Sequence, residues 1–341
     1  MKKNLSLLAC LLIVLFLSSC DNIGTSGSKA TGGTSELLII TDTPEQWQGR
    51  VGDSLKAFFN RYVYALPQPE PQYDLLHASI KKFENNPLYI SHSTILILHS
   101  DKTVTTPTID VKRNQWASPQ VIITLIASSD SALLSAFSQY KAAIDELFKK
   151  NQFERAQNLY KISSGKEAEA LLKSKFNIDI LIPGSFSIAL KSNDFLWLRQ
   201  AVHRKKQDTE LGLIFYQLPY RDTAQFGLSH IIRQRDSIGF NYIKGPTDGS
   251  YMASSVDVIP PIREVSEDKE TGYRAITRGL WMMKKDFMGG PFITYTLYNK
   301  KQNKILTAEG YAYNPNGEKR NFMIQLEAIL QSIRFSEEPK K

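Results

Sequence analysis

The chain opens with a leader that decides which residues can take part in a fold. Lys2 and Lys3 are followed by an apolar run over residues 5–17. This run is too short for a permanent membrane-spanning helix, which needs about 20 residues. A positive start and a short apolar segment are typical of a secretory signal peptide that is removed on export. We therefore expect residues 1–19 to be cleaved and the fold to be built from the rest.

The leader ends in the tetrapeptide Leu17-Ser18-Ser19-Cys20. This segment resembles the lipobox of bacterial lipoproteins, in which an aliphatic residue and two small residues precede the acylated cysteine. The resemblance implies palmitate on Cys20 and a protein anchored by lipid in the cell envelope, at the inner or the outer membrane, with the outer favoured. The alternative is an ordinary leader that happens to contain a cysteine.

The remaining composition excludes several classes of protein. Cys10 is lost with the leader, so the mature chain has no thiol for a disulfide, a metal or a nucleophile. Lys and Arg exceed Asp and Glu by 42 to 34, but the basic residues are scattered. A scattered excess indicates a solubilising surface, so we expect no nucleic-acid partner.

The mature chain divides into a tether and two halves. Residues 20–35 are rich in Gly, Ser and Thr, a composition that predicts a flexible tether. Residues 36–165 are expected to form an N-terminal α+β domain, and residues 176–336 a C-terminal α+β domain.

Hydrophobic patterns predict the elements of the first half. Residues 36–41 and 121–127 read as buried strands, and further strands are expected over 75–83 and 94–98. Thr43 followed by Pro44 predicts the start of a helix. A long helix is expected from about Ser129, so this half reads β-α-β-β-β-α.

The second half reads β-β-β-α-β-β-β-α. The predicted strands cover residues 186–190, 195–199, 211–217, 273–283, 292–299 and 305–313. Helical patterns cover residues 223–240 and the segment through Phe322 and Ile333. The predicted fold class is α+β, with antiparallel sheets covered by helices in two α/β halves.

Two resemblances concern larger parts of the chain. Ile182-Pro183, YRAITRGLW at residues 273–281, the segment 288–292 and Ile333-Arg334-Phe335 resemble a Bacteroidota family of lipoproteins known only as a domain of unknown function. Residues 182–335 are also similar in element order to PsbP-like proteins. The first resemblance implies no activity, and the PsbP-like fold usually hosts binding or assembly roles.

A ligand site is expected around four residues of the second half. Arg274 and Arg278 have even spacing on a predicted strand, so they share one face and could bind an anion. Gly289 and Gly290 would let a backbone approach a ligand. The competing interpretation is that both arginines are solvated on an outer face and that the glycines form a bulge or hairpin end.

No motif indicates an enzyme. The five histidines form no HxH or HxxxH pair, and GxSxG, Walker A and GxGxxG motifs are absent. The sequence therefore predicts no catalytic residue, metal or cofactor. We expect a non-enzymatic binding or assembly factor whose partner is an envelope protein or glycan. An envelope hydrolase acting on glycan or peptide and a carbohydrate-binding module remain as alternatives.

Overall fold

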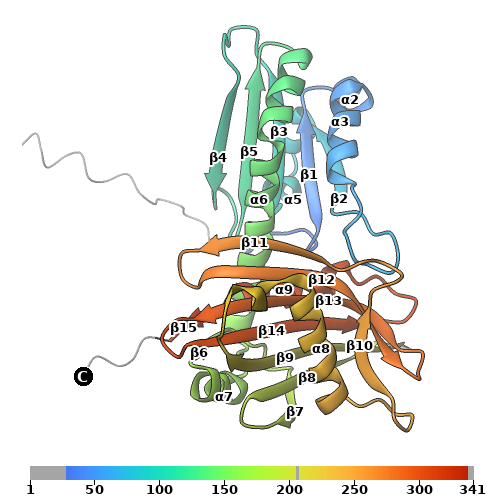
Figure 1. Ribbon diagram of the computed structural model, residues 1–341. Coiled ribbons are helices and arrows are strands. Elements are labelled where there is room, and N and C mark those ends of the chain that lie inside the picture. Colours follow the sequence, from blue (N-terminus) through green and yellow to red (C-terminus); the bar gives the residue numbers. More distant parts are fainter. Residues whose placement is uncertain (1–27, 205–206, 337–341) are drawn as a thin grey trace, which may run out of the picture.

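The protein is built around two large sheets that lie one above the other in Figure 1. The computed structural model describes residues 28–204 and 207–336. A five-stranded sheet comes from the first half of the chain and an eight-stranded sheet from the second. The α+β class predicted from the sequence is confirmed.

The first sheet has the strand order β2-β1-β3-β5-β4. Its strands are β1 (Glu36–Thr41), β2 (Asp74–Ser79), β3 (Thr94–Ser100), β4 (Thr108–Arg113) and β5 (Val121–Ala127). All pairs are parallel except β4 with β5. The expected antiparallel pairing is wrong for this sheet, because helices connect β1 to β2 and β2 to β3 and so allow parallel crossovers.

Helices cover both faces of the first sheet. They are α2 (Pro44–Gln48), α3 (Arg50–Phe59), α4 (Ile80–Glu84), α5 (Pro87–Ile90) and α6 (Asp130–Ile162). The segment expected as a strand over residues 75–83 thus ends in a helix. The predicted helix starts are confirmed, since the side chains of Thr43 and Ser129 accept hydrogen bonds from Gln46 N and Ala132 N.

Strand β1 shows why this sheet needs two covering layers. Leu37 and Ile39 pack with α3 and α6, whereas Leu38 and Ile40 pack with residues of α4 and α5. All four side chains are fully buried. A strand that is buried on both faces reads as a continuous apolar run, as parallel strands commonly do.

The second sheet is antiparallel throughout, in the order β10-β12-β13-β14-β9-β8-β7, with β11 also paired to β12. Its strands are β7 (Ser187–Lys191), β8 (Phe195–Arg204), β9 (Gln207–Pro219), β10 (Tyr251–Ser255), β11 (Ile262–Asp268), β12 (Gly272–Lys284), β13 (Gly289–Asn299) and β14 (Lys304–Tyr313). The six strands predicted for this half are present, while β10 and β11 were not predicted.

Three helices cover the two faces of the second sheet. Helix α9 (Arg320–Gln331) packs on one face together with α7 (Lys166–Phe176), and α8 (Leu228–Tyr242) packs on the other. A short 3-10 helix, η2 (Thr223–Phe226), precedes α8. After α9, the chain forms β15 (Arg334–Phe335), which pairs with β6 (Ile178–Asp179).

The two halves are joined through α9. Helix α6 continues past the first sheet, and Gln157 and Tyr160 near its end donate hydrogen bonds to carbonyl groups of α9. From the loop between α3 and β2, Glu70 accepts hydrogen bonds from Lys319 N and Arg320 N, both at 2.8 Å. The first half thus supplies the cap that α9 lacks in its own segment.

Residues 28–35 are part of the folded body, although the sequence predicted a tether up to residue 35. Lys29 and Thr31 form bridges with Ser118 and His92. Arg155 of α6 donates hydrogen bonds to the carbonyl oxygens of residues 32 and 33. The chain therefore joins the body at the amino-terminal ends of β3 and β5.

Candidate functional site

The strand order of the first sheet creates a crossover point between β1 and β3. The chain leaves β1 toward β2 on one side, whereas β3 lies on the other side of β1 and is followed by β4 and β5. In open sheets of parallel strands, ligands bind outside the carboxyl ends of the strands where such connections diverge. Side chains at the carboxyl ends of β1 and β3 are therefore candidates for a ligand site.

Asp42 and His99 meet at this point. Asp42 directly follows β1, and its Oδ1 lies 2.7 Å from Nδ1 of His99 in β3. The second carboxylate oxygen accepts the backbone N–H of Ser100 at 2.7 Å. Because a carboxylate only accepts, Nδ1 carries the proton and Nε2 is left available. The His99 side chain is 48% exposed, so this nitrogen edge can meet a ligand.

A second layer of hydrogen bonds holds this pair in place. Gln46 of α2 accepts the backbone N–H of Asp42 and donates to Oδ1 of Asp130 at 2.7 Å. Asp130 is the first residue of α6 and also accepts from the Ser100 hydroxyl. The ends of β1 and β3 and the start of α6 are thereby joined into one polar cluster.

His77 extends the cluster along the sheet. Its Nε2 lies 2.8 Å from the Thr41 hydroxyl, and its ring stacks on Trp47 at 4.7 Å. The ammonium group of Lys56 lies over the Trp47 ring, with Nζ 4.5 Å from the ring centroid. Burial, helped by nearby lysines, lowers the pKa of His77 from 6.5 to about 4. This histidine is therefore neutral at physiological pH.

The geometry suits recognition or proton transfer at His99. A carboxylate that orients an imidazole through Nδ1 leaves Nε2 able to accept a hydrogen bond from a hydroxyl or amide. The same orientation is used by catalytic histidines that act as general bases. Within residues 28–204 and 207–336, no group of three potential ligand side chains could hold a metal ion.

The sequence did not reveal that Asp42 and His99 lie close together in the fold. Asp42 and His99 lie 57 positions apart, and only parallel pairing of β1 with β3 brings them together. Spacing along the chain tests the histidines only as metal ligands and does not reveal a carboxylate partner from another strand. The available signal was a polar residue at the end of each of two strongly apolar strands.

Arg274 and Arg278 do lie on one face of β12, and both reach α9. Arg278 forms a bidentate ion pair with Glu327 at 2.7 and 3.0 Å. Arg274 donates to Gln331 and lies 3.4 Å from Asp268. A ligand at these arginines stays a prediction, and it would have to compete with partners already present in the chain.

Gly289 and Gly290 lie farther along the same strand pair. They pair with Met282 and Trp281, whereas Arg278 pairs with Ile293. A Cβ on Gly290 would lie 2.0 Å from the carbonyl oxygen of Ala312. The glycine therefore permits close approach of a neighbouring strand. Cys20, the predicted lipidation site, lies outside the described residues.

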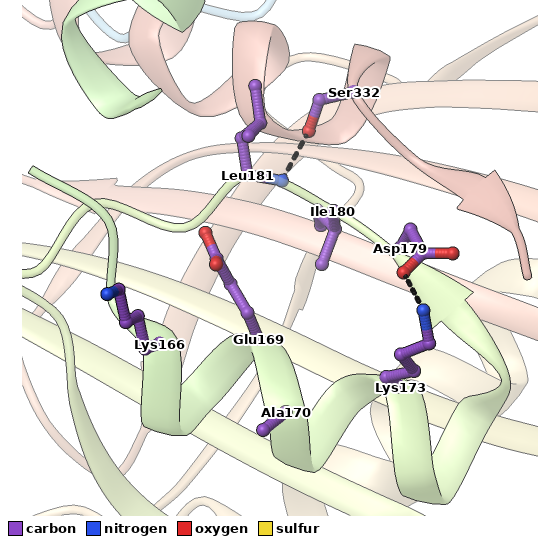
Figure 2. A pocket seen from close by; sticks show the side chains of 8 residues that line it. All are labelled: Lys166, Glu169, Ala170, Lys173, Asp179, Ile180, Leu181 and Ser332. Atoms are coloured by element: carbon purple, nitrogen blue, oxygen red, sulfur yellow. Dashed lines mark hydrogen bonds and ion pairs between the residues drawn. The ribbon is translucent and has the colours of Figure 1, made fainter. Parts of the chain in front are cut away.

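An open hollow of about 500 Å³ lies between α7, β6 and the end of α9. Figure 2 shows Lys173 directed toward Asp179 and the Ser332 hydroxyl directed toward Leu181 N. The hydrogen bond from Lys173 lowers the pKa of Asp179. Glu169 accepts hydrogen bonds from Ile182 N and the hydroxyl of Ser164. These polar groups are engaged within the chain, so the hollow is a weaker candidate than the His99 cluster.

Comparison with known families divides the chain into two parts. Residues 30–161 match a family described as Domain of unknown function (DUF8532), and residues 165–332 match Domain of unknown function (DUF4837). A search of curated proteins gives no match. The chain thus contains two domains of unknown function, which is the part of the expected resemblance that these comparisons support. In the described part of the chain, no helix is both long enough and apolar enough to cross a membrane.

Proposed function

We propose that this chain is a lipid-anchored protein of a bacterial cell envelope with a non-enzymatic role in binding or assembly. The anchor is supported by Lys2, Lys3, the apolar run after them and the lipobox-like segment that ends in Cys20. The outer membrane is the favoured location, and an envelope protein or glycan is the proposed partner.

The observation that carries the binding role is the Asp42–His99 pair at the crossover point of the first sheet. Its imidazole edge is exposed and is held in one orientation before any ligand arrives, which reduces the entropy lost on binding. The pair lies at the carboxyl ends of the parallel strands, whereas residues 28–33 join the body at the amino ends. The site therefore lies at the end of the sheet that is remote from the tether.

Lipidation is tested by labelling cells with a radioactive or clickable palmitate. The wild-type chain should take up label and sediment with membranes. Cys20→Ala should lose the label, and either leave the membrane or accumulate as uncut precursor. Label retained by Cys20→Ala would contradict the proposal.

The binding site is tested in a strain that lacks the gene and shows an envelope phenotype. His99→Ala and Asp42→Asn should be produced and folded at wild-type levels but should not restore the phenotype. Asp110→Asn is a matched control, because Asp110 is an exposed carboxylate of β4 that lies 3.6 Å from Lys112. Full restoration by both site variants would remove the proposed role of this pair.

A hydrolase is the second candidate function, because the Asp42–His99 geometry also suits a general base. His99→Gln separates the two roles. Glutamine keeps hydrogen-bonding groups near the same position, so a binding function should be reduced by less than about tenfold. Loss of a general base lowers a rate by about 10²–10⁴-fold. A phenotype as severe as that of His99→Ala would therefore favour the hydrolase.

Three finer proposals concern glycan binding, the family relationship and the fold of the second half. A carbohydrate-binding role would need exposed aromatic rings, and Tyr62, Tyr64 and Tyr273 are exposed whereas Trp281 is buried. The proposed Bacteroidota relationship is supported by the segments 182–183, 273–281, 288–292 and 333–335, which resemble that family. Similarity of residues 182–335 to PsbP-like proteins is supported by a sheet between helices that ends in α9 and β15.

A further inference from the structure

The hairpin between β12 and β13 ends in an exposed phenylalanine. Phe287 is 105% exposed, the highest value for a large apolar side chain among the described residues. Lys284 and Lys285, which Asp286 separates from Phe287, are also exposed. A fully exposed aromatic ring is unfavourable in water, so its presence at a hairpin tip suggests a contact surface.

Neighbouring elements add further aromatic and basic side chains to this tip. Tyr251 of β10 pairs with Lys284 in the sheet. Its ring contacts Phe240 of α8 edge to face at 5.0 Å, and Phe240 is itself 54% exposed. Lys244 lies over Phe240 with Nζ 4.5 Å from the ring centroid. The hairpin-tip surface, defined as Phe240, Phe287, Lys244, Lys284 and Lys285, thus combines two exposed rings with three lysines.

Hydrogen bonds hold the tip in this conformation. Met283 N donates to the carbonyl oxygen of Met288 at 2.8 Å and closes the hairpin. Asp286 accepts hydrogen bonds from the Thr247 hydroxyl at 3.0 Å and from Phe287 N at 2.7 Å. These contacts hold the hairpin against the loop after α8, on a backbone that leaves Phe287 exposed.

The charge of the surface favours an anionic partner. Three lysines face two carboxylates, those of Asp248 and Asp286, and Asp286 is engaged by Thr247. At a bilayer surface, aromatic rings bury in the interface while lysine stems extend and place their ammonium groups among the headgroups. Each lysine near an anionic leaflet adds about 1 kcal/mol of attraction.

We propose that the hairpin-tip surface rests on an anionic lipid bilayer and forms a second membrane contact beside the lipid on Cys20. This inference takes from the proposed function only that a membrane is close. Residues 20–28 span up to about 28 Å when extended, so a tether of this length leaves several faces of the body able to turn toward the bilayer. The second contact would select one of them.

The experiment uses the mature chain with Cys20→Ser, which carries no lipid, in flotation with vesicles. Vesicles of phosphatidylglycerol and phosphatidylcholine are compared with phosphatidylcholine alone. The chain should float with the anionic vesicles, and Phe287→Ser should lower its partition coefficient about tenfold. Lys284→Glu with Lys285→Glu should lower it by at least about tenfold.

Ile162→Ser is the matched control, because Ile162 is 85% exposed at the end of α6, which contacts α9, whereas the hairpin contacts the loop after α8. It should float like the unaltered chain, and circular dichroism should show that all variants are folded. The proposal is overturned if the unaltered chain does not float with anionic vesicles. It is equally overturned if Phe287→Ser floats as well as Ile162→Ser. Because no lipid is attached, either result is independent of whether Cys20 is acylated in cells.

Discussion

Replacing Glu70 by alanine should destabilise the protein by about 2–4 kcal/mol. The carboxylate is buried, at 4% exposure, and accepts the first two backbone N–H groups at the start of α9. Loss of a helix cap costs about 1 kcal/mol, and each buried N–H left without an acceptor costs about 1–3 kcal/mol. These costs overlap, so their simple sum would be too high. Glu70→Gln keeps an acceptor and should lose about half as much.

The loss can be measured by equilibrium unfolding in urea followed by tryptophan fluorescence. Trp47 and Trp116 lie with the first sheet, and Trp197 and Trp281 lie in strands of the second. The signal therefore reports on both halves. Free energies of unfolding are obtained by linear extrapolation to zero urea.

Glu84→Ala provides the control, because Glu84 is an exposed carboxylate at the end of α4. Its free energy of unfolding should stay within about 0.5 kcal/mol of the wild type. If Glu70→Ala also costs less than about 1 kcal/mol, the reasoning that α9 depends on a cap from the first half is refuted.

Three further predictions concern buried groups. Because burial lowers the pKa of His77 from 6.5 to about 4, the unfolded chain takes up this proton first on acidification. The contribution of His77 to stability should thus be constant above pH 6.5 and be lost between about pH 6.5 and 4, and urea midpoints of His77→Asn should lack this contribution. Arg235→Met should cost about 3–5 kcal/mol in urea unfolding, because Glu309 is 1% exposed and would lose its bidentate partner. Gly290→Ala should cost at least about 2 kcal/mol and lower the thermal midpoint, because the new Cβ would lie 2.0 Å from the carbonyl oxygen of Ala312.

The second sheet could be predicted well because its order is largely local. Strands β13 and β14 follow each other through a short turn and pair as a hairpin, so the alternation and turn signals of neighbouring segments describe their arrangement. Strands β10 and β11 were not predicted. Strand β11 is rich in charged residues and β10 has only five residues, so neither gives a clear apolar strand pattern.

Four of the five strands of the first sheet could be predicted, but β4, the helices α4 and α5 and the parallel pairing could not. Hydrophobic periodicity indicates that β1 and β5 are buried, yet it does not state which strand lies beside which. The continuous apolar runs ELLIIT and VIITLIA were themselves a sign of burial on both faces and hence of parallel strands. The Asp42–His99 pair followed from that pairing and was missed with it.

For the candidate residues of the second half, the shared strand face could be predicted but the partner residues could not. Even spacing predicted correctly that Arg274 and Arg278 share a face of β12. It could not show that Glu327 lies opposite Arg278, because this partner comes from a helix 49 positions away. Strand periodicity identifies a shared face, but what covers that face depends on long-range packing.

Helix α6 has a consequence for the order in which the protein can fold. Its 33 residues extend about 50 Å, and Gln157 and Tyr160 near its end donate hydrogen bonds to carbonyl groups of α9. Glu70, much earlier in the chain, also accepts its hydrogen bonds from backbone N–H groups at the start of α9. Because a chain is synthesised from its amino terminus, these groups of the first half emerge long before their partners. The first half therefore completes its structure only when the last helix arrives, and its final step of folding follows the end of synthesis.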